Sequence, residues 1–209
     1  LSFLSTQNVL NVSSEELLKA ACCNLSESFE TNPAIDVNFD NALTGVKQVQ
    51  MMGLPSPYLL FTEENIPIIR GASQVYGLSF TPGTWIESLQ ITKGAGSVIN
   101  GYESMTGQIN AELKKPLTSE KMFFNLFRSF EGRNELNFHT KTTLSSKLSA
   151  NLFVHFNQLS EKIDKNNDGF LDLPLSEQVN ILSRFQYFDT EKGWVSFFNI
   201  RFLQDDKIF

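Results

Sequence analysis

A period-two alternation of apolar and polar residues runs through the C-terminal part of the chain, from Met122 to its end at Phe209. Apolar side chains take alternate positions in five successive runs, and mostly short polar segments typical of turns separate the runs. Successive side chains of a β-strand point to opposite faces, so each run predicts a strand with one apolar and one polar face. Because short turns join antiparallel neighbours, the pattern restricts this region to an antiparallel sheet.

The apolar positions keep one parity within each run. They are even-numbered in the first three runs, odd-numbered in the fourth and even-numbered again in the fifth. In chain order the runs contain Met122, Phe124, Leu126 and Phe130; Leu136 and Phe138; Leu148, Ala150, Leu152, Val154 and Phe156; Val179, Ile181, Phe185 and Tyr187; and Trp194, Phe198, Ile200 and Phe202.

Runs of about ten residues are longer than the roughly 5–6 residues of an ordinary soluble strand. They match the strands of outer-membrane barrels, which have about 9–11 residues, an apolar outer face and a polar interior. The alternative is a soluble antiparallel sandwich with one buried face. Five strands cannot close a barrel, because the smallest barrels have about eight. The barrel interpretation therefore implies a fragment, and it places Arg128, which lies on the apolar parity, near a membrane interface.

The region up to Pro116 contains most of the twelve glycines and mixes helical with strand patterns. A helix is expected to begin at Ser13 or Ser14, which can cap the acidic first turn, and to end before Pro33. Short apolar runs bounded by proline or glycine predict strands at 58–61, 66–69 and 86–91. We therefore predict an α+β domain over residues 1–116, followed by roughly five barrel strands over residues 117–209.

The stretch from Trp85 to Leu113 resembles the end of the plug domain of TonB-dependent outer-membrane receptors. In that family the plug ends with a strand, a glycine-rich turn carrying a small hydroxyl residue, and a Gly-x-Ile-Asn strand that leads into the barrel. Here the turn reads Lys93-Gly94-Ala95-Gly96-Ser97 and the last strand begins Gly107-Gln108-Ile109-Asn110. Three other pieces, at 24–29, 32–37 and 58–61, look similar to the family as well, and the order and spacing of the four motifs make the resemblance specific. The sequence of the glycine-rich stretch is most similar to receptors that are abundant in Bacteroidota and often close to metal or cobalamin receptors.

The resemblance implies a set of plug-motif residues: Gly53, Arg70, Gly71, Glu87, Lys93, Gly94, Gly96, Ser97, Gly101, Gly107 and Asn110. A phosphate-binding loop is the alternative for the glycine-rich turn, but no Gly-Lys-Ser/Thr and no helix pattern follow it. One departure concerns the Ile-Arg-Gly strand of the family, whose arginine is thought to hold the plug against barrel carboxylates. This chain has Met51-Met52-Gly53 there, and it remains open whether Arg70 takes over that role. No TonB box is recognisable.

The resemblance also implies the function. We expect a plugged barrel of about 22 strands in full, located in the cell outer membrane. It would take up a scarce nutrient, such as a metal complex, a siderophore or a cobalamin-like molecule. Its partners would be the TonB complex of the inner membrane, outer-membrane lipid and the small-molecule or metal-complex substrate. The alternatives are a non-transporting receptor or assembly component on the same scaffold, and a soluble calcium-binding β protein.

Two function classes are excluded by the residues themselves. The formal net charge of −6 argues against a nucleic-acid partner, because a row of phosphates needs a basic surface. No arrangement of Ser, His and Asp or of Cys and His suits nucleophilic catalysis, so we do not expect an enzyme. His139 and His155 lie on polar faces of neighbouring strands. The parity places His139 opposite Asn151 or Phe153, too far along the strand for the two histidines to share a metal.

An acidic segment is the one candidate metal site. Oxygen ligands recur at every second residue, with Gly169 at the sixth position, as in a calcium loop. The expected ligands are Asp164, Asn166, Asp168, the Phe170 carbonyl and Asp172. Leu175 replaces the glutamate of the twelfth position and no helix flanks the segment, so a solvated acidic loop is the alternative. We expect the loop from 160 to 178 to be extracellular. No cofactor is required, and a structural calcium ion is the only ligand expected here.

Overall fold

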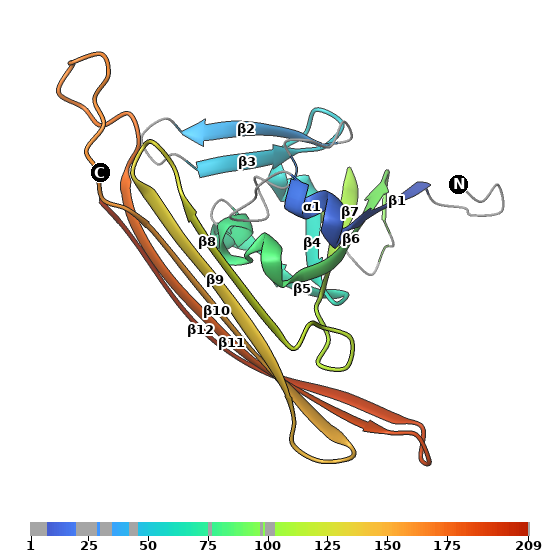
Figure 1. Ribbon diagram of the computed structural model, residues 1–209. Coiled ribbons are helices and arrows are strands. Elements are labelled where there is room, and N and C mark those ends of the chain that lie inside the picture. Colours follow the sequence, from blue (N-terminus) through green and yellow to red (C-terminus); the bar gives the residue numbers. More distant parts are fainter. Residues whose placement is uncertain are drawn as a thin grey trace. The chain divides into compact units, whose positions relative to one another are not determined.

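The computed structural model describes residues 8–19, 29, 35–41, 46–74, 77–96, 98 and 103–208 (Figure 1). It divides into two compact units, Leu1–Leu113 and Lys114–Phe209. The boundary expected from the sequence, after residue 116, lies close to this division. Among the described residues, no helix has the length and apolar character needed to cross a membrane.

The first unit is built on a five-stranded sheet of order β1-β6-β7-β4-β5. Only the β4–β7 pair is parallel. The strands are β1 (Asn8–Ser13), β4 (Leu59–Glu63), β5 (Ile66–Ile69), β6 (Ile86–Lys93) and β7 (Gly107–Leu113). The strands predicted at 58–61, 66–69 and 86–91 are thus confirmed. β1 was not predicted, because its mixed Asn and Val pattern is weak and pairing with β6 makes it a strand.

Helical segments and a separate hairpin complete the first unit. Helix α1 (Ser14–Lys19) confirms the start of the predicted helix. Of its expected continuation towards Pro33, residues 20–28 and 30–32 lie outside the described residues, whereas Phe29 lies in a turn and not in a helix. The hairpin pairs β2 (Asp36–Asn41) with β3 (Val46–Gln50). The 3₁₀ segments that lie wholly within the described residues include η1 (Ser56–Tyr58), η2 (Gly71–Gln74), η3 (Gly77–Phe80) and η4 (Gly83–Trp85).

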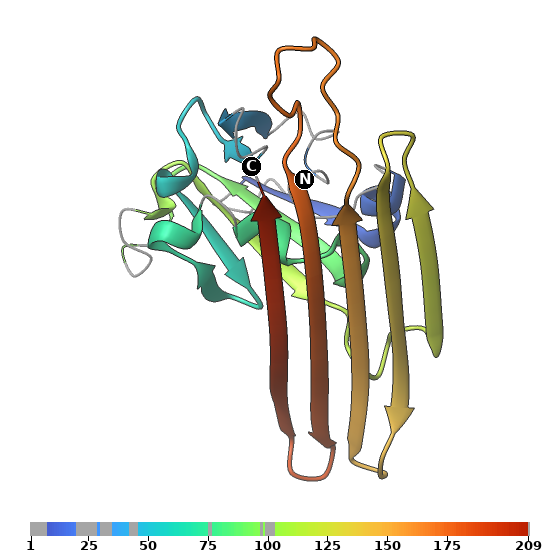
Figure 2. The ribbon, with the colours of Figure 1, turned by 90° about the vertical axis from the view of Figure 1, so that its left-hand side faces the viewer.

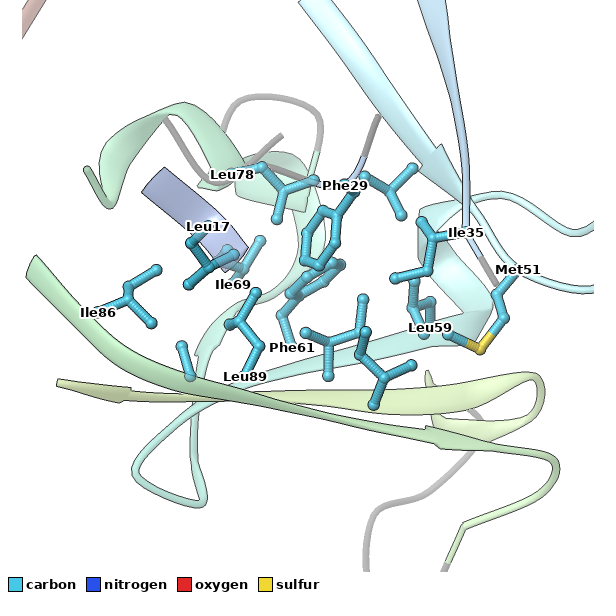
Figure 3. Packing of buried hydrophobic residues seen from close by; sticks show 14 residues of the cluster. Leu17, Phe29, Ile35, Met51, Leu59, Phe61, Ile69, Leu78, Ile86 and Leu89 are labelled. Carbon is cyan, nitrogen blue, oxygen red and sulfur yellow. The ribbon is translucent and has the colours of Figure 1, made fainter. Parts of the chain in front are cut away.

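The core of the first unit lies against one face of this sheet (Figure 3). Alternate residues of β6 supply Leu89 and Ile91, and helix α1 supplies Leu17. Phe29 and Phe61 pack with ring centroids 6.4 Å apart. Each fully buried side chain of this size contributes about 1.5–3 kcal/mol relative to an exposed one. The apolar contacts thus hold α1, the β2–β3 hairpin and the sheet together as one body.

The second unit is a five-stranded antiparallel meander of order β12-β11-β10-β9-β8 (Figure 2). Its strands are β8 (Met122–Arg128), β9 (Arg133–Thr143), β10 (Leu148–Leu159), β11 (Leu175–Asp189) and β12 (Trp194–Ile208). All five runs of the sequence therefore form strands. The register places His139 opposite Phe153 and His155 opposite Asn137, as the parity predicted for the first of these pairs.

Two strands are longer than expected from the sequence. β11 and β12 have 15 residues each, and Ser176 and Glu177 of β11 pair with Lys207 and Asp206 of β12. The predicted loop from 160 to 178 is therefore wrong at its end, and the connection is residues 160–174. The reason is that backbone pairing between β11 and β12 continues past the last apolar positions. Hydrophobic alternation alone therefore underestimates the length of each strand.

Burial in the second unit is inverted relative to a water-soluble sheet. Apolar residues are exposed, for example Met122 at 69% and Phe198 at 62%, whereas the polar Asn180 and His155 are at most 1% exposed. Odd positions of β9 and β10 and even positions of β11 carry most of the buried polar side chains, with Asp189 at the end of β11 as an exception. This confirms the parity assigned from the sequence. A soluble sandwich would bury the apolar face, so the exposure pattern favours a membrane-barrel wall.

The one long connection of this sheet and the short turns are distributed over its two ends. Residues 160–174 and the β8–β9 turn lie at one end, and the short turns at 144–147 and 190–193 lie at the other (Figure 2). Arg128 is the last residue of β8 and forms an ion pair with Glu161 at 3.5 Å. The arginine on the apolar parity therefore lies at a strand end, where an interface was expected.

Candidate functional site

Asn110 is the centre of a buried polar network on the sheet of the first unit. Its Oδ1 accepts hydrogen bonds from the Thr62 hydroxyl and from the Asn65 backbone N–H, both at 2.8 Å. Its Nδ2 donates to Glu112 Oε1 at 3.0 Å. The side chain is 2% exposed, and the parallel β4–β7 register places it directly opposite Thr62. The asparagine of the Gly-x-Ile-Asn motif therefore joins β7 to β4 and to the turn that follows β4.

Gly107, at the start of the same motif, lies where a side chain does not fit. A Cβ at this position would collide with the Thr92 carbonyl oxygen and the Met51 sulfur. Strand pairing sets the position of Thr92, opposite Gln108. Gly107 is therefore required by close backbone approach, as the motif implied.

The glycine-rich turn after β6 is closed by backbone hydrogen bonds. The Gly94 N–H donates to the Thr106 carbonyl at 2.9 Å, and the Gly96 N–H donates to the Ser104 carbonyl at 2.8 Å. Gly94 has φ +92°, a conformation that side chains rarely adopt. Ser97 and Gly101 of the predicted motif lie outside the described residues. Lys93 ends β6 and is exposed, and Glu87 is half-buried on the same strand.

Arg70 forms an ion pair within the first unit. Its Nε lies 2.8 Å from Glu103 Oε2, and the Glu103 side chain is only 11% exposed. The neighbouring Gly71 begins η2. Met52 and Gly53 both have positive φ and form the tip of a tight turn closed by Met51 and Leu54, with Met52 69% exposed. The structure thus assigns Arg70 a carboxylate in its own unit, and the locking role considered from the sequence stays a prediction.

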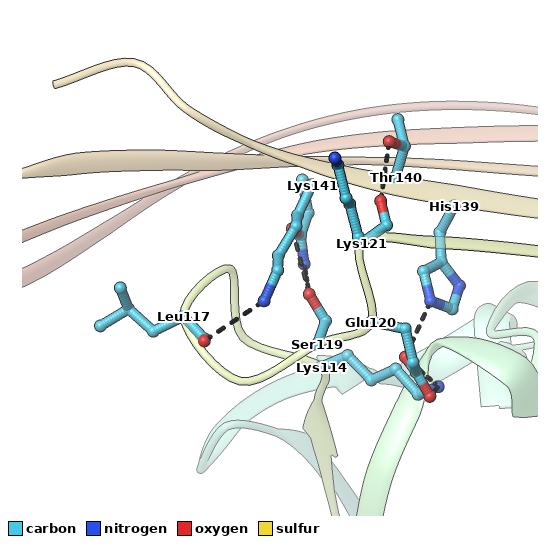
Figure 4. Close-up of polar contacts among 9 residues, drawn as sticks. Lys114, Leu117, Ser119, Glu120, Lys121, His139, Thr140 and Lys141 are labelled. Atoms are coloured by element: carbon cyan, nitrogen blue, oxygen red, sulfur yellow. Dashed lines mark hydrogen bonds and ion pairs between the residues drawn. The ribbon is translucent and has the colours of Figure 1, made fainter.

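A second polar cluster, not anticipated from the sequence, surrounds Glu120 in the second unit (Figure 4). Glu120 Oε2 lies 3.1 Å from both Lys114 Nζ and His139 Nε2. Ser119 and Asn151 exchange two hydrogen bonds, of 3.3 and 3.0 Å. Partial burial raises the pKa of Glu120, but hydrogen bonds from its own backbone N–H, Lys114 and His139 outweigh it and lower this pKa to about 2. The carboxylate is therefore ionised under all ordinary conditions.

Buried polar groups also fill the polar face of the long strands. His155 Nδ1 lies 2.8 Å from Asn137 Oδ1, and the Asn137 amide donates to Glu135 Oε1 at 2.7 Å. The Arg184 guanidinium lies 4.4 Å from the centre of the Phe197 ring. The two histidines have separate partners and do not form a metal pair, in agreement with the parity argument.

In the acidic loop, the carboxylates accept hydrogen bonds from backbone N–H groups of the same loop. Asp164 accepts hydrogen bonds from the N–H groups of Asp168 and Gly169, and Asp168 accepts one from Phe170. Asp172 Oδ2 accepts from the Lys165 N–H at 2.9 Å. Within the described residues, His, Cys, Asp and Glu side chains nowhere gather in threes as a metal site requires. Calcium binding by Asp164, Asn166, Asp168, Phe170 and Asp172 therefore stays a prediction.

The two units have the folds of a plug and of the opening wall of a plugged outer-membrane barrel. A family model described as the TonB-dependent receptor plug domain matches residues 3–108, about half of the chain. The chain therefore belongs to the TonB-dependent receptors, as its motifs indicated. This is a family of receptors rather than enzymes.

Solved structures with the same fold are receptors of this family. The siderophore receptor PirA from Acinetobacter baumannii has a TM-score of 0.73 and 17% identity, over 96% of this chain and 32% of that one. The ferric yersiniabactin uptake receptor FyuA from Yersinia pestis has a TM-score of 0.77 and 14% identity, over 94% of this chain and 31% of that one. The pyoverdine outer membrane receptor FpvA from Pseudomonas aeruginosa PAO1 has a TM-score of 0.76 and 13% identity, over 97% of this chain and 28% of that one.

The chain thus spans about a third of the length of these structures. The likeness establishes that a plug is followed by barrel strands, and the low identities carry no information on substrate. A search of curated proteins finds no match to this chain. The similarity to Bacteroidota receptors suggested by the motif wording stays a prediction.

Proposed function

We propose that the chain is part of a receptor that takes up a small-molecule metal complex, siderophore-like or cobalamin-like, across the outer membrane. The observation that carries this proposal is the order of the two folds. A plug-family unit ends at Leu113, and long strands with an exposed apolar face begin at Met122. Neighbours of the same fold are named for siderophores, ferric yersiniabactin and pyoverdine, which are small iron-binding molecules or their complexes.

Energised opening is the second part of the proposal. In a plugged barrel, a plug with an apolar core of its own would close the pore, so we propose that uptake requires the plug to rearrange. We propose that the inner-membrane TonB complex supplies the force. The receptor would lie in the outer membrane, with its apolar strand face against lipid.

The test is a reversible tether inside the plug. β1 lies at the edge of the sheet and pairs with β6, with Asn11 opposite Gln90. In the full-length receptor with Cys22 and Cys23 replaced by serine, N11C/Q90C would join the two strands by a disulfide. We expect uptake of a radiolabelled iron complex to be lost on oxidation and restored by a reductant, while surface binding is unchanged. The matched control is the single variant N11C.

Two outcomes would contradict the proposal. Uptake that continues through a tether verified by mass spectrometry would show that the plug need not rearrange there. Failure of the reduced receptor to take up any of a panel of siderophore, haem and cobalamin complexes would favour a non-transporting receptor.

A further inference from the structure

The segment between the last plug strand and the first barrel strand is bound to the barrel-type sheet along its length. This linker segment comprises residues 114–121, between β7 and β8, and all of it belongs to the second unit. It contains a short turn, in which the N–H groups of Thr118 and Ser119 donate to the Lys115 carbonyl at 3.1 and 2.9 Å. The segment is therefore an ordered structure with contacts of its own.

Strand β9 holds the C-terminal end of the linker segment. Glu120 Oε2 lies 3.1 Å from His139 Nε2, and His139 is 1% exposed. The Lys121 carbonyl accepts hydrogen bonds from the Thr140 hydroxyl at 3.0 Å and from the Lys141 N–H at 3.1 Å. Three consecutive residues of β9 thus bind two residues of the linker segment.

Strand β10 holds the middle of the same segment. Ser119 and Asn151 are 7% and 2% exposed and each donates to the other. Both groups lose water, so their mutual bonds are expensive to break. Because Asn151 lies opposite Lys141 in the β9–β10 register, the two strands offer adjacent binding groups.

Lys114, the first residue of the linker segment, forms an ion pair with Glu120 near the end of the segment. Lys114 Nζ lies 3.1 and 3.2 Å from the two carboxylate oxygens of Glu120, and it also lies 5.4 Å from the centre of the Phe123 ring. Lys114 is 8% exposed, so this ion pair is shielded on the lysine side. A pulling force applied to the chain at Leu113 would therefore act first on Lys114. The Lys114–Glu120 ion pair and the contact of Glu120 with His139 would pass this force to β9 (Figure 4).

We propose that the linker segment is a fixed anchor. When the plug domain rearranges, the chain up to Leu113 moves, while residues 114–121 stay bound to β9 and β10. The anchor keeps the start of β8 in register, because the load is carried by two inner strands instead of the short strand β8. This inference rests on the proposed function only in assuming that the plug moves.

The test pulls the full-length receptor, in a lipid bilayer, from the N-terminal side of the plug in a single-molecule force experiment. In the wild type we expect the released chain to end at Leu113 before the barrel resists. In the double variant S119A/E120Q the Lys121 carbonyl still binds β9, so the released length should grow by the seven residues 114–120, about 23–25 Å at roughly 3.3–3.6 Å per residue. K121Q is the matched control, because Lys121 binds β9 through its carbonyl oxygen.

The readout needs no uptake, so it is separate from the test of transport. Equal released lengths in the wild type and the double variant would overturn the anchor. A wild-type release that already extends through residue 120 would also overturn it, and this result requires no variant to fold. Loss of uptake in the tether experiment with the expected lengths here would support both proposals, and continued uptake with the expected lengths would reject only the transport proposal.

Discussion

At the residue scale, the motifs located the right part of the chain but not the partners of each side chain. Asn110 was singled out from its motif, and its role in joining β7 to Thr62 and Asn65 depends on a parallel pairing between segments far apart in the sequence. Glu120 was missed because a single acidic residue before a strand carries no pattern. Its importance comes from Lys114 and His139, which only the folded chain brings to it.

Glu120 gives a prediction of pH dependence. Its pKa falls from 4.5 to about 2 in the folded chain, so its contribution to stability is complete above about pH 4.5 and is lost as the pH falls towards 2. The groups that face it are Lys114 and His139. We expect hydrogen exchange of residues 117–121 in the full-length receptor to be slower in the wild type than in E120Q at pH 7 and 5. The difference should vanish near pH 2, once rates are corrected for intrinsic exchange. A difference independent of pH would show that the charge is not responsible.

At the element scale, alternation predicts that a strand exists but not where it ends. The apolar band stops before β11 and β12 do, and their polar ends continue by backbone pairing, which the side-chain pattern does not record. β1 shows the same limit in the first unit, because β6 supplies its partner. The strand parities were predictable because the period of two is a property of every strand and one face must differ from the other.

The exposed face of β10 gives a second prediction. Leu152 lies on the apolar face, and an arginine near the bilayer midplane costs about 2–4 kcal/mol. L152R should therefore reduce the amount of folded receptor in the outer membrane, measured by heat-modifiable mobility on gels. N157R is the control on the polar face of the same strand. Asn151 is unsuitable as a control because it binds Ser119. Equal yields of L152R and N157R would contradict the assignment of the lipid face.

The loop at 160–174 gives a third prediction, which tests the calcium motif. Its carboxylates accept backbone hydrogen bonds, and Lys165 binds Glu131 at 2.8 Å, so the loop has order without a metal. If Asp164, Asp168 and Asp172 bind calcium, millimolar calcium should slow proteolysis of this loop in the wild type, as for weak extracellular sites. D164A/D168A should show no such effect. Cleavage at one rate with and without calcium would leave the hydrogen-bonded acidic loop as the sufficient description.

At the scale of the whole molecule, the order of plug and strands was accessible from the sequence because each part has its own signature. Glycines with fixed roles mark the plug, as Gly107 shows by its close approach to Thr92. Alternation marks the strands, and the two patterns succeed each other without overlap. The substrate was not accessible, because recognition depends on side chains brought together by the complete receptor, and this chain spans about a third of its structural neighbours.

The 15 residues of β11 and β12 have a consequence for the height of the wall they form. At about 3.3 Å per residue such a strand is roughly 50 Å long, and a 45° tilt gives it a vertical reach of about 35 Å. The hydrocarbon band of an outer membrane is only about 25 Å tall. In an outer membrane such a wall would therefore extend beyond the hydrocarbon layer into the headgroup region. Water would then reach both faces of the strand ends, and this is where the paired ends of β11 and β12 carry the charged residues Glu177, Asp206 and Lys207.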